Sequence, residues 1–395
     1  MRILMISDVY FPRVNGVSTS ILTYRRELLS QGHEVVLIAP SYDEPWDDDA
    51  DVLRIPARQV FLDPEDRLMQ RGFVRDMIGE LRKRNFHLVH IQTPFLAHYL
   101  GVQLAKRLGI PRVETYHTFF EEYLYHYIPF LPRQLLRYAA RRFTCSQCNN
   151  VDAVVVPSTA MLEVLRNYGV RSHAEVIPTG LEPDRFGPGN GAAFRRRHAI
   201  PEDRPVLVHI GRVAFEKNID FLLHVLLKIR GTVTDILLVI AGEGPALPHL
   251  RAMVERLGLA DNVLFVGYLA RDTELLDCYR AGDVFVFASR TETQGLVLLE
   301  AMAQGTPVVS TAVMGTRDVL RDGVGALIAV EDADAFAAKV LLVLQDPRCR
   351  ARLTASAPPY AHSWSAARLA ERMMAFYTQV IAQHQENGVP VAEAG

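Results

Sequence analysis

The stretch DVFVFASRTETQGLVLLEAMAQGTPVVS, Asp283–Ser310, decides the fold of this chain. Near its start, Val284–Phe287 is a short apolar run typical of a buried strand, and near its end Pro307–Ser310 has the pattern of the next strand. The apolar run Leu296–Met302 between them indicates a helix. A strand, loop, helix and strand in this order are the repeating unit of a parallel α/β sheet.

Two glutamates stand eight residues apart in this unit, Glu292 in the loop and Glu300 about two turns into the helix. Glu292 follows a strand, at the edge where open α/β sheets bind ligands. Glu300 interrupts the apolar run, so we expect it to be buried among hydroxyl donors, because an unpaired buried charge is costly. The backbone N–H groups of Gln294, Gly295 and Leu296 begin the helix and predict an anion site. The alternative is two ordinary surface acids.

Strands and amphipathic helices alternate along most of the chain. Expected strands in the first half are Ile3–Ile6, Glu34–Ala39, Leu88–Gln92, Arg112–Thr115, Ala153–Pro157 and Ala174–Ile177. Expected strands in the second half are Val206–Ile210, Ile236–Ala241, Val263–Val266, Val284–Phe287 and Pro307–Ser310. Helical periods lie between them, as in Ser18–Ser30 and Phe221–Ile229. The pattern predicts an α/β protein built from two doubly wound parallel sheets.

The length and composition indicate two domains. A chain of 395 residues exceeds what one hydrophobic core usually supports. Residues 183–204 are rich in Gly, Pro and charge, so we expect them to link an N-terminal domain, residues 1–182, to a C-terminal domain, residues 205–364. Residues 365–395 are expected to form a final helix and a tail.

Polar residues follow other strands of the predicted sheets. The cations Arg212 and Lys217 lie where a helix begins, and two cations there suit a diphosphate because the helix dipole also favours anions. Asn15 and Gly16 follow the first strand and permit a tight turn that brings the backbone close to a ligand. His117 also follows a strand. The alternatives are solvated loop cations, a structural turn and a structural histidine.

These motifs resemble those of the retaining glycosyltransferases of family 4, which have the GT-B fold. The resemblance rests on the two glutamates of the E-x7-E pattern, with seven residues between them, and on Asn15–Ser18, Tyr116–Thr118 and Gly211–Asn218, in the order that the family has them. It implies two Rossmann-like domains that face a central cleft, and a final helix that crosses back to the first domain. It also implies a nucleotide-sugar donor.

The resemblance further implies a role for each matching residue. Arg212 and Lys217 match residues that contact the donor diphosphate, and Glu300 matches the one that binds the ribose hydroxyls. Glu292 matches the residue that bonds hydroxyls of the transferred sugar, and His117 the histidine that approaches that sugar. In the front-face mechanism attributed to such enzymes, the leaving diphosphate helps to deprotonate the acceptor, so Glu292 and His117 need not be covalent nucleophiles. Gly16 is counted among the donor-binding residues.

The acceptor is indicated by a basic region. Residues 54–142 hold 15 Lys and Arg against 8 Asp and Glu, an excess of seven that the whole-chain charge of −2 hides. Two sets of arginines recur at helical spacing beside apolar residues: Arg67, Arg71 and Arg75, then Arg133, Arg137 and Arg141. Basic amphipathic helices suit an anionic membrane surface, although helices with solvated arginines and a buried apolar face are the alternative.

The segments Tyr116–Tyr127 and Thr291–Leu296 resemble bacterial diacylglycerol glucosyltransferases. We therefore expect a cytoplasmic enzyme, peripheral on the inner face of the membrane, that transfers a hexose, glucose from UDP-glucose, to diacylglycerol or a related lipid. A soluble transferase making polysaccharides or small glycosides is the alternative within the class. A nucleotide-sugar epimerase and a non-catalytic sugar-nucleotide sensor are alternatives from other classes.

Other features exclude further kinds of site. The net charge argues against a dedicated nucleic-acid binder, and no apolar run is long enough to span a bilayer. Cys145 and Cys148 form a lone C-x-x-C, for which a structural role is favoured over zinc or redox chemistry. The acidic run Asp47–Asp49 with Asp51 is expected to be a solvated loop rather than a metal site. The diphosphate is then neutralised by cations and helix dipoles, and no metal is expected to be required.

Overall fold

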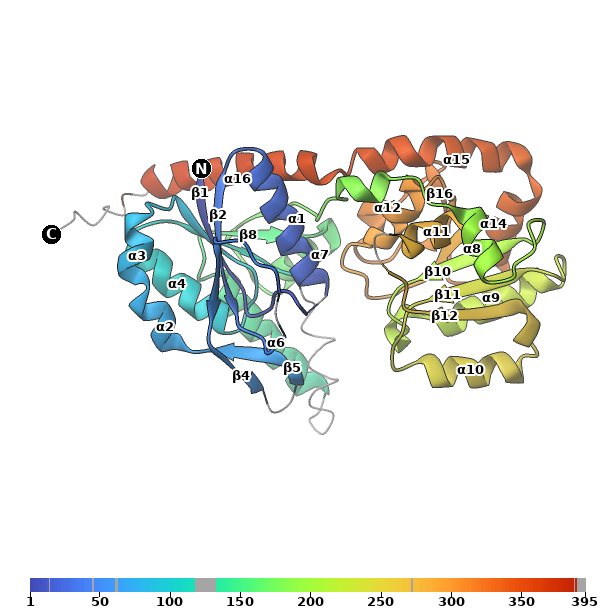
Figure 1. Ribbon diagram of the computed structural model, residues 1–395, viewed down its shortest axis with the longest axis horizontal. Coiled ribbons are helices and arrows are strands. Elements are labelled where there is room, and N and C mark those ends of the chain that lie inside the picture. The colour runs from blue at the N-terminus through green and yellow to red at the C-terminus, as the bar shows by residue number, and fades with distance from the viewer. Residues whose placement is uncertain are drawn as a thin grey trace. The chain divides into compact units, whose positions relative to one another are not determined.

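The computed structural model of the protein describes residues 1–13, 15–44, 46–60, 63–117, 133–270, 273–386 and 388. The chain divides into two compact units (Figure 1). The first comprises Met1–Thr179 and Ala366–Gly395, and the second comprises Gly180–Ser365. Each unit is a parallel sheet between layers of helices. Within the described residues, no helix is both long enough and apolar enough to cross a bilayer.

The first unit contains a seven-stranded parallel sheet in the order β3-β2-β1-β6-β7-β8-β9. Its strands are β1 (Arg2–Ile6), β2 (Glu34–Pro40), β3 (Val52–Ile55), β6 (Leu88–Ile91), β7 (Arg112–Thr115), β8 (Ala153–Val156) and β9 (His173–Val176). Central strands such as β1 and β6 are apolar throughout because helices cover both faces of the sheet. The carboxyl ends of all seven strands therefore meet at one edge.

Helices pack on both faces of this sheet. Ile3 and Met5 of β1 join a core that α1 (Gly16–Ser30) and α16 (Ala366–Glu386) complete from one side. On the opposite face, α4 (Leu96–Leu108) lies so close that a Cβ on Gly101 would come within 2.6 Å of the Ile91 side chain. The unit also contains α2 (Arg71–Asp76), α3 (Ile78–Lys83), α6 (Arg133–Cys148), α7 (Thr159–Asn167) and a hairpin of β4 (Ala57–Val60) and β5 (Asp63–Met69).

The second unit repeats the plan with the strand order β12-β11-β10-β13-β14-β16-β15. Its strands are β10 (Val206–Ile210), β11 (Leu237–Ala241), β12 (Val263–Gly267), β13 (Val284–Phe287), β14 (Val308–Thr311), β15 (Arg321–Asp322) and β16 (Gly325–Ala329). Each adjacent pair in this order is parallel. The expected α/β class, with two Rossmann-like sheets, is therefore confirmed.

Two apolar cores hold the helices of this unit against its sheet. One is completed by α9 (Ile219–Arg230), α10 (Leu247–Arg256) and α14 (Ala333–Gln345). The other is completed by α8 (Gly191–Arg197), α11 (Glu274–Ala281), α12 (Leu296–Ala303) and α15 (Pro347–His362). Short turns of helix, η1 (Pro183–Phe186), η2 (Phe215–Lys217), η3 (Ala260–Asn262) and α13 (Thr316–Val319), occupy the loops.

Residues 183–204, expected to be a linker, are part of the second unit instead. They form η1 and α8, and the Phe194 side chain is fully buried in the core with α11. A Cβ on Gly191 would lie 2.5 Å from the carbonyl oxygen of Arg280, so glycine permits α8 to approach α11 closely. Gly191, one of the glycines that indicated a linker, thus serves close packing instead.

The prediction that Arg67, Arg71 and Arg75 recur along one helix is wrong. Arg67 lies in strand β5, whereas Arg71 and Arg75 lie in the short helix α2. Arg67 instead forms an ion pair with Asp43 and its guanidinium lies over the Tyr42 ring. The spacing of four residues crosses the boundary between a strand and a helix, so it does not place the three side chains on one face. Strands β3, β4, β5, β15 and β16 were also not predicted.

Candidate functional site

The loops at the carboxyl edge of the second sheet are bonded to one another. The Gly211 N–H donates to the Ala241 carbonyl, and the Val213 N–H donates to the Glu243 carbonyl. A Cβ on Gly242 would lie 2.0 Å from the Gly211 carbonyl oxygen, so only glycine permits this contact. The loops that follow β10 and β11 therefore form one framework that positions the cations following β10.

Lys217 and Glu292, predicted from separate motifs, meet in the structure. The Lys217 Nζ donates to Glu292 Oε2 at 2.7 Å, and both side chains are largely buried. Asn218 adopts the left-handed conformation that ends η2, and its side-chain amide donates to the Ala288 carbonyl just after β13. The Glu292 carbonyl accepts the Gly315 N–H. Backbone and amide bonds thus fix both partners of the ion pair.

The second predicted cation, Arg212, is held less firmly. Its side chain is 66% exposed and its Nη1 lies 3.7 Å from Oε1 of Glu216, four residues further along the chain. An exposed ion pair of this length contributes little stability. Arg212 is therefore able to turn toward an anion at the edge of the sheet without breaking a buried contact.

Glu300 is buried in α12, as the sequence predicts, with 4% of its surface exposed. The Tyr279 Oη of α11, itself fully buried, donates to Glu300 Oε2 at 2.7 Å. Tyr279 is a residue of the candidate site that the motifs did not identify. The expectation that a buried Glu300 needs a hydroxyl donor was the available signal, but the donor lies on another helix.

The start of α12 has the predicted form. Gly295 is the N-cap residue at φ 93°, and the helix begins at Leu296. A Cβ on Gly295 would approach the side chains of Leu298 and Thr316 to 3.1 Å, and a positive φ is strained for other residues. The turn that contains Gln294, Gly295 and Leu296 therefore opens this helix four residues after Glu292.

In the first unit, His117 lies at the carboxyl edge of the sheet. Its Nε2 lies 3.1 Å from Gln92 Oε1, which follows the neighbouring strand β6. Burial lowers the pKa of His117 to about 4, so the ring is neutral at pH 7. His90 of β6 is hydrogen-bonded to Thr115 Oγ1 at the end of β7, at 2.7 Å, and to the Tyr377 hydroxyl at 2.6 Å. A neutral imidazole here is suited to hydrogen bonding with a polar substrate group.

The turn expected at Asn15 and Gly16 is instead a helix start. The Asn15 side chain accepts the Ser18 N–H at 2.9 Å, and the Ser18 hydroxyl accepts the Asn15 N–H at 3.2 Å, which is a capping box. Gly16 is the first residue of α1, and a Cβ placed on it would meet nothing within 4 Å. The backbone at Gly16 is thus open to an approaching ligand, but Asn15 has a structural role.

The acidic run Asp47–Asp49 with Asp51 was expected to be a solvated loop. In the structure, arginines form ion pairs with three of these aspartates. Arg54 bonds Asp48, Arg25 bonds Asp49, and Arg84 bonds Asp51. No group of His, Cys, Asp or Glu suited to a metal occurs in the part of the chain that the structure describes. The thiols of Cys145 and Cys148 are free, and burial raises the pKa of Cys148.

Helix α6 exposes part of the basic amphipathic surface that the sequence predicts for membrane contact. Arg137 and Arg141 are exposed, and so are the apolar side chain of Leu135, at 53%, and the ring of Tyr138, at 64%. Leu136 faces the core instead. The aromatic segment Phe119–Tyr127 lies outside the described residues. Basic and apolar side chains thus share the exposed side of α6.

Comparison with known proteins follows the division into two units. Residues 14–185 match the family model described as Glycosyltransferase Family 4, and residues 191–358 match Glycosyl transferases group 1. The chain is 35% identical over 320 residues to the alpha-monoglucosyldiacylglycerol synthase of Streptococcus pneumoniae, covering 78% of this chain and 71% of that protein. It is 30% identical over 376 residues to a GDP-mannose-dependent alpha-mannosyltransferase of Mycobacterium tuberculosis, covering 92% and 93%.

Solved structures share the fold. Sucrose-phosphate synthase from Thermosynechococcus elongatus matches with a TM-score of 0.75 at 22% identity, covering 97% of this chain and 99% of that one. WaaG, a glycosyltransferase involved in lipopolysaccharide biosynthesis, matches with a TM-score of 0.71 at 17% identity, covering 95% and 99%.

Proposed function

Because the chain belongs to the family 4 glycosyltransferases of the GT-B type, we propose that it is a retaining enzyme that transfers glucose from UDP-glucose to diacylglycerol or a related membrane lipid. The observation that carries the proposal is the contact between Lys217 and Glu292, whose loops follow the neighbouring strands β10 and β13. This arrangement puts cations for a leaving diphosphate beside an acid for the hydroxyl groups of a sugar.

In the proposed reaction, Arg212 and Lys217 bind the diphosphate, Glu300 the ribose hydroxyls and Glu292 the hydroxyls of the glucose. The bond between the anomeric carbon and the diphosphate oxygen breaks as charge accumulates on the leaving group, which the two cations stabilise. The acceptor oxygen bonds to the same face of that carbon, and its proton passes to the leaving diphosphate. His117, neutral at pH 7, hydrogen-bonds the transferred sugar.

The lipid acceptor and the membrane location are supported by two observations. One relative named above is a synthase of alpha-monoglucosyldiacylglycerol. The exposed side of α6 combines Arg137 and Arg141 with Leu135 and Tyr138, which suits the interface of an anionic membrane. We propose that the enzyme works at the inner face of the cell membrane through this surface.

A second candidate donor is GDP-mannose, because the mannosyltransferase relative matches 93% of its own length. Purified protein is therefore incubated with labelled UDP-glucose or GDP-mannose, with and without diacylglycerol micelles, and lipid-soluble label is measured. The proposal expects label from UDP-glucose only when lipid is present, and an α linkage in the product. A β-linked product would exclude retention, and donor conversion without lipid would favour an epimerase.

The proposed site uses no metal. The donor diphosphate is neutralised by Arg212, Lys217 and the start of α12, so full activity is expected in EDTA. Activity that disappears in EDTA and returns with a divalent cation would contradict this part of the proposal.

A further inference from the structure

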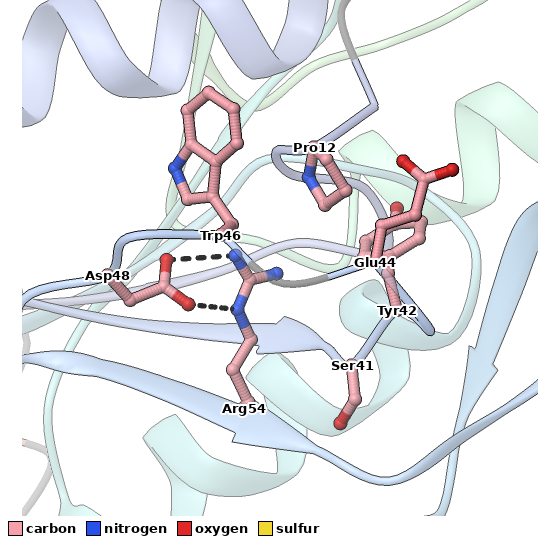
Figure 2. Close-up of a pocket in the computed structure, with 7 residues that line it drawn as sticks. All are labelled: Pro12, Ser41, Tyr42, Glu44, Trp46, Asp48 and Arg54. Carbon is pink, nitrogen blue, oxygen red and sulfur yellow. Dashed lines mark hydrogen bonds and ion pairs between the residues drawn. The ribbon is translucent and has the colours of Figure 1, made fainter.

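A pocket of about 180 Å³ lies at the carboxyl edge of the first sheet (Figure 2). Pro12 of the loop after β1 forms one side, and Ser41, Glu44 and Trp46 of the segment after β2 form another. Arg54 of β3 and Asp48 complete it. The pocket is smaller than the roughly 300 Å³ at which sites for drug-sized ligands begin, so it suits a small headgroup.

Arg54 holds one wall of the pocket in place. Its guanidinium donates to both carboxylate oxygens of Asp48, at 2.7 and 2.8 Å, as Figure 2 shows. It also donates to the carbonyl oxygens of Pro40 and Phe11, each at 2.8 Å. The three nitrogens of the guanidinium are thus all engaged, and its charge is balanced by Asp48. Arg54 is therefore a support for the wall rather than a site for a phosphate.

The rest of the loop is also anchored. The Trp46 ring stacks on Phe11, with 4.8 Å between centroids and 20° between planes, yet Trp46 remains 45% exposed. The buried guanidinium of Arg25 binds Asp49 through two hydrogen bonds. The pocket is therefore built by a loop tied to β1, α1 and β3, and an aromatic ring remains accessible beside it.

Glu44 gives the pocket its charge. It is exposed, and no ion pair or hydrogen bond of its side chain occurs among the residues that the structure describes. Because Arg54 and Asp48 cancel each other, the pocket carries the negative charge of Glu44. A carboxylate accepts hydrogen bonds from hydroxyl groups and repels phosphate.

We propose that this pocket binds the hydroxyl-bearing headgroup of an uncharged acceptor, and that Glu44 discriminates against phosphorylated acceptors. The proposal rests on the proposed function, because it assigns the acceptor of that reaction. The exposed Trp46 ring packs against the apolar backbone of the headgroup, since aromatic rings contribute large contact areas. Glu44 and the Ser41 hydroxyl supply polar contacts. Diacylglycerol meets these requirements, whereas lipids with a phosphate in the headgroup do not.

Trp46 provides a direct test of binding. The chain has two tryptophans, Trp46 and Trp364, and they lie in different units, so Trp364→Phe leaves only the pocket fluorophore. The full-length Trp364→Phe protein is titrated in neutral detergent with dioctanoylglycerol and, separately, with dioctanoyl phosphatidylglycerol. We expect the Trp46 emission to change at about fivefold lower concentrations of the uncharged lipid, because one repelling charge about 4 Å away costs about 1 kcal/mol in water.

Two charge reversals in the same loop separate the pocket from general electrostatics. Glu44→Lys should remove the preference, whereas Asp47→Lys should keep it, because Asp47 is equally exposed but does not line the pocket. Equal effects of the two variants, or no response of Trp46 to dioctanoylglycerol, would overturn the proposal. If Trp46 binds the uncharged lipid with the Glu44 effect but no label is transferred, the pocket assignment holds and the proposed reaction fails. If label is transferred to the lipid but the Trp46 emission does not change, the proposed reaction holds and the pocket assignment fails.

Discussion

Lys217 and Glu292 are joined by an ion pair of 2.7 Å, although 75 residues separate them in the sequence. Lysine has three N–H donors and a carboxylate has about four acceptor sites, so each group can keep this bond and still bind a ligand. In the proposed reaction the pair therefore connects the group that stabilises the leaving diphosphate with the group that orients the sugar. A change at either residue is expected to affect the other.

Removal of either cation should slow the reaction. Arg212→Ala and Lys217→Ala are each expected to lower kcat/KM roughly ten- to a hundred-fold. This corresponds to a loss of about 1.5–3 kcal/mol of transition-state stabilisation, because both contacts strengthen as the leaving group gains charge. Lys217→Ala should be the more damaging, since it also leaves Glu292 without its partner. Lys228→Ala, which removes an exposed cation from α9, is the control. Activity within twofold of the parent in both site variants would reject the diphosphate assignment.

The two glutamates should be separable by their effects on UDP. Glu300→Gln is expected to weaken UDP and donor together, because a ribose contact does not depend on the sugar. Glu292→Gln should spare UDP affinity and lose turnover. Calorimetric titration with UDP measures both, with the exposed Glu255→Gln as control. Loss of UDP binding in Glu292→Gln as large as in Glu300→Gln would mean that these roles are wrongly divided.

Tyr279→Phe tests whether the hydroxyl donor orients Glu300. Loss of the 2.7 Å bond should weaken UDP binding in the same direction as Glu300→Gln but by less, about 1–2 kcal/mol, because the carboxylate remains. Tyr138→Phe removes an exposed hydroxyl from the other unit and should leave UDP binding unchanged. Unaltered UDP affinity in a folded Tyr279→Phe protein would limit Tyr279 to a packing role.

These residues also indicate how far the sequence determines the site. The burial of Glu300 was predictable, because one acid interrupts an apolar helix. Its donor Tyr279 was not, because the contact joins two helices and leaves no local periodicity. The ion pairs of Asp48 and Asp49 were missed for the same reason, since their arginines lie in β3 and α1. Local pattern specifies strands, helices and burial, whereas side-chain pairing depends on tertiary packing.

Acid should destabilise the folded protein through its buried histidines. Burial lowers the pKa of His90 to about 3 and the pKa values of His117 and His209 to about 4, from 6.5. Between about pH 6.5 and 4 the unfolded chain binds more protons at these positions, so their contribution to stability is lost as the pH falls. Burial raises the pKa of Glu114, which acts in the opposite direction, so variants are needed to isolate the histidines.

His209→Phe is the sharpest of these variants. His209 is fully buried and stacks on Phe287, so phenylalanine retains an aromatic ring there and removes the titrating group. We expect the loss in free energy of unfolding between pH 7.5 and 5 to shrink by about 1–2 kcal/mol. Urea unfolding at both pH values measures it, with the exposed His224→Gln as control. The same pH dependence in His209→Phe and the parent would contradict the assignment.

The membrane surface can be tested by removing the arginines of α6. Each charge contact with anionic lipid contributes about 1 kcal/mol, so replacing Arg133, Arg137 and Arg141 with Gln should weaken vesicle binding by up to about 3 kcal/mol. The difference should shrink in high salt, because charges are screened beyond a Debye length of about 8 Å at 0.15 M. UDP binding should be unchanged, since these arginines lie in the other unit from Glu300.

Vesicle co-sedimentation at low and high salt makes this measurement, with phosphatidylglycerol present or absent. A matched variant with Arg256, Arg348 and Arg352 changed to Gln removes three exposed arginines from the second unit and should bind vesicles like the parent. Equal loss in the two triple variants would indicate nonspecific attraction through total charge. Salt-insensitive binding that neither variant alters would mean that the arginines of α6 are solvated surface residues, and would favour an acceptor outside the membrane.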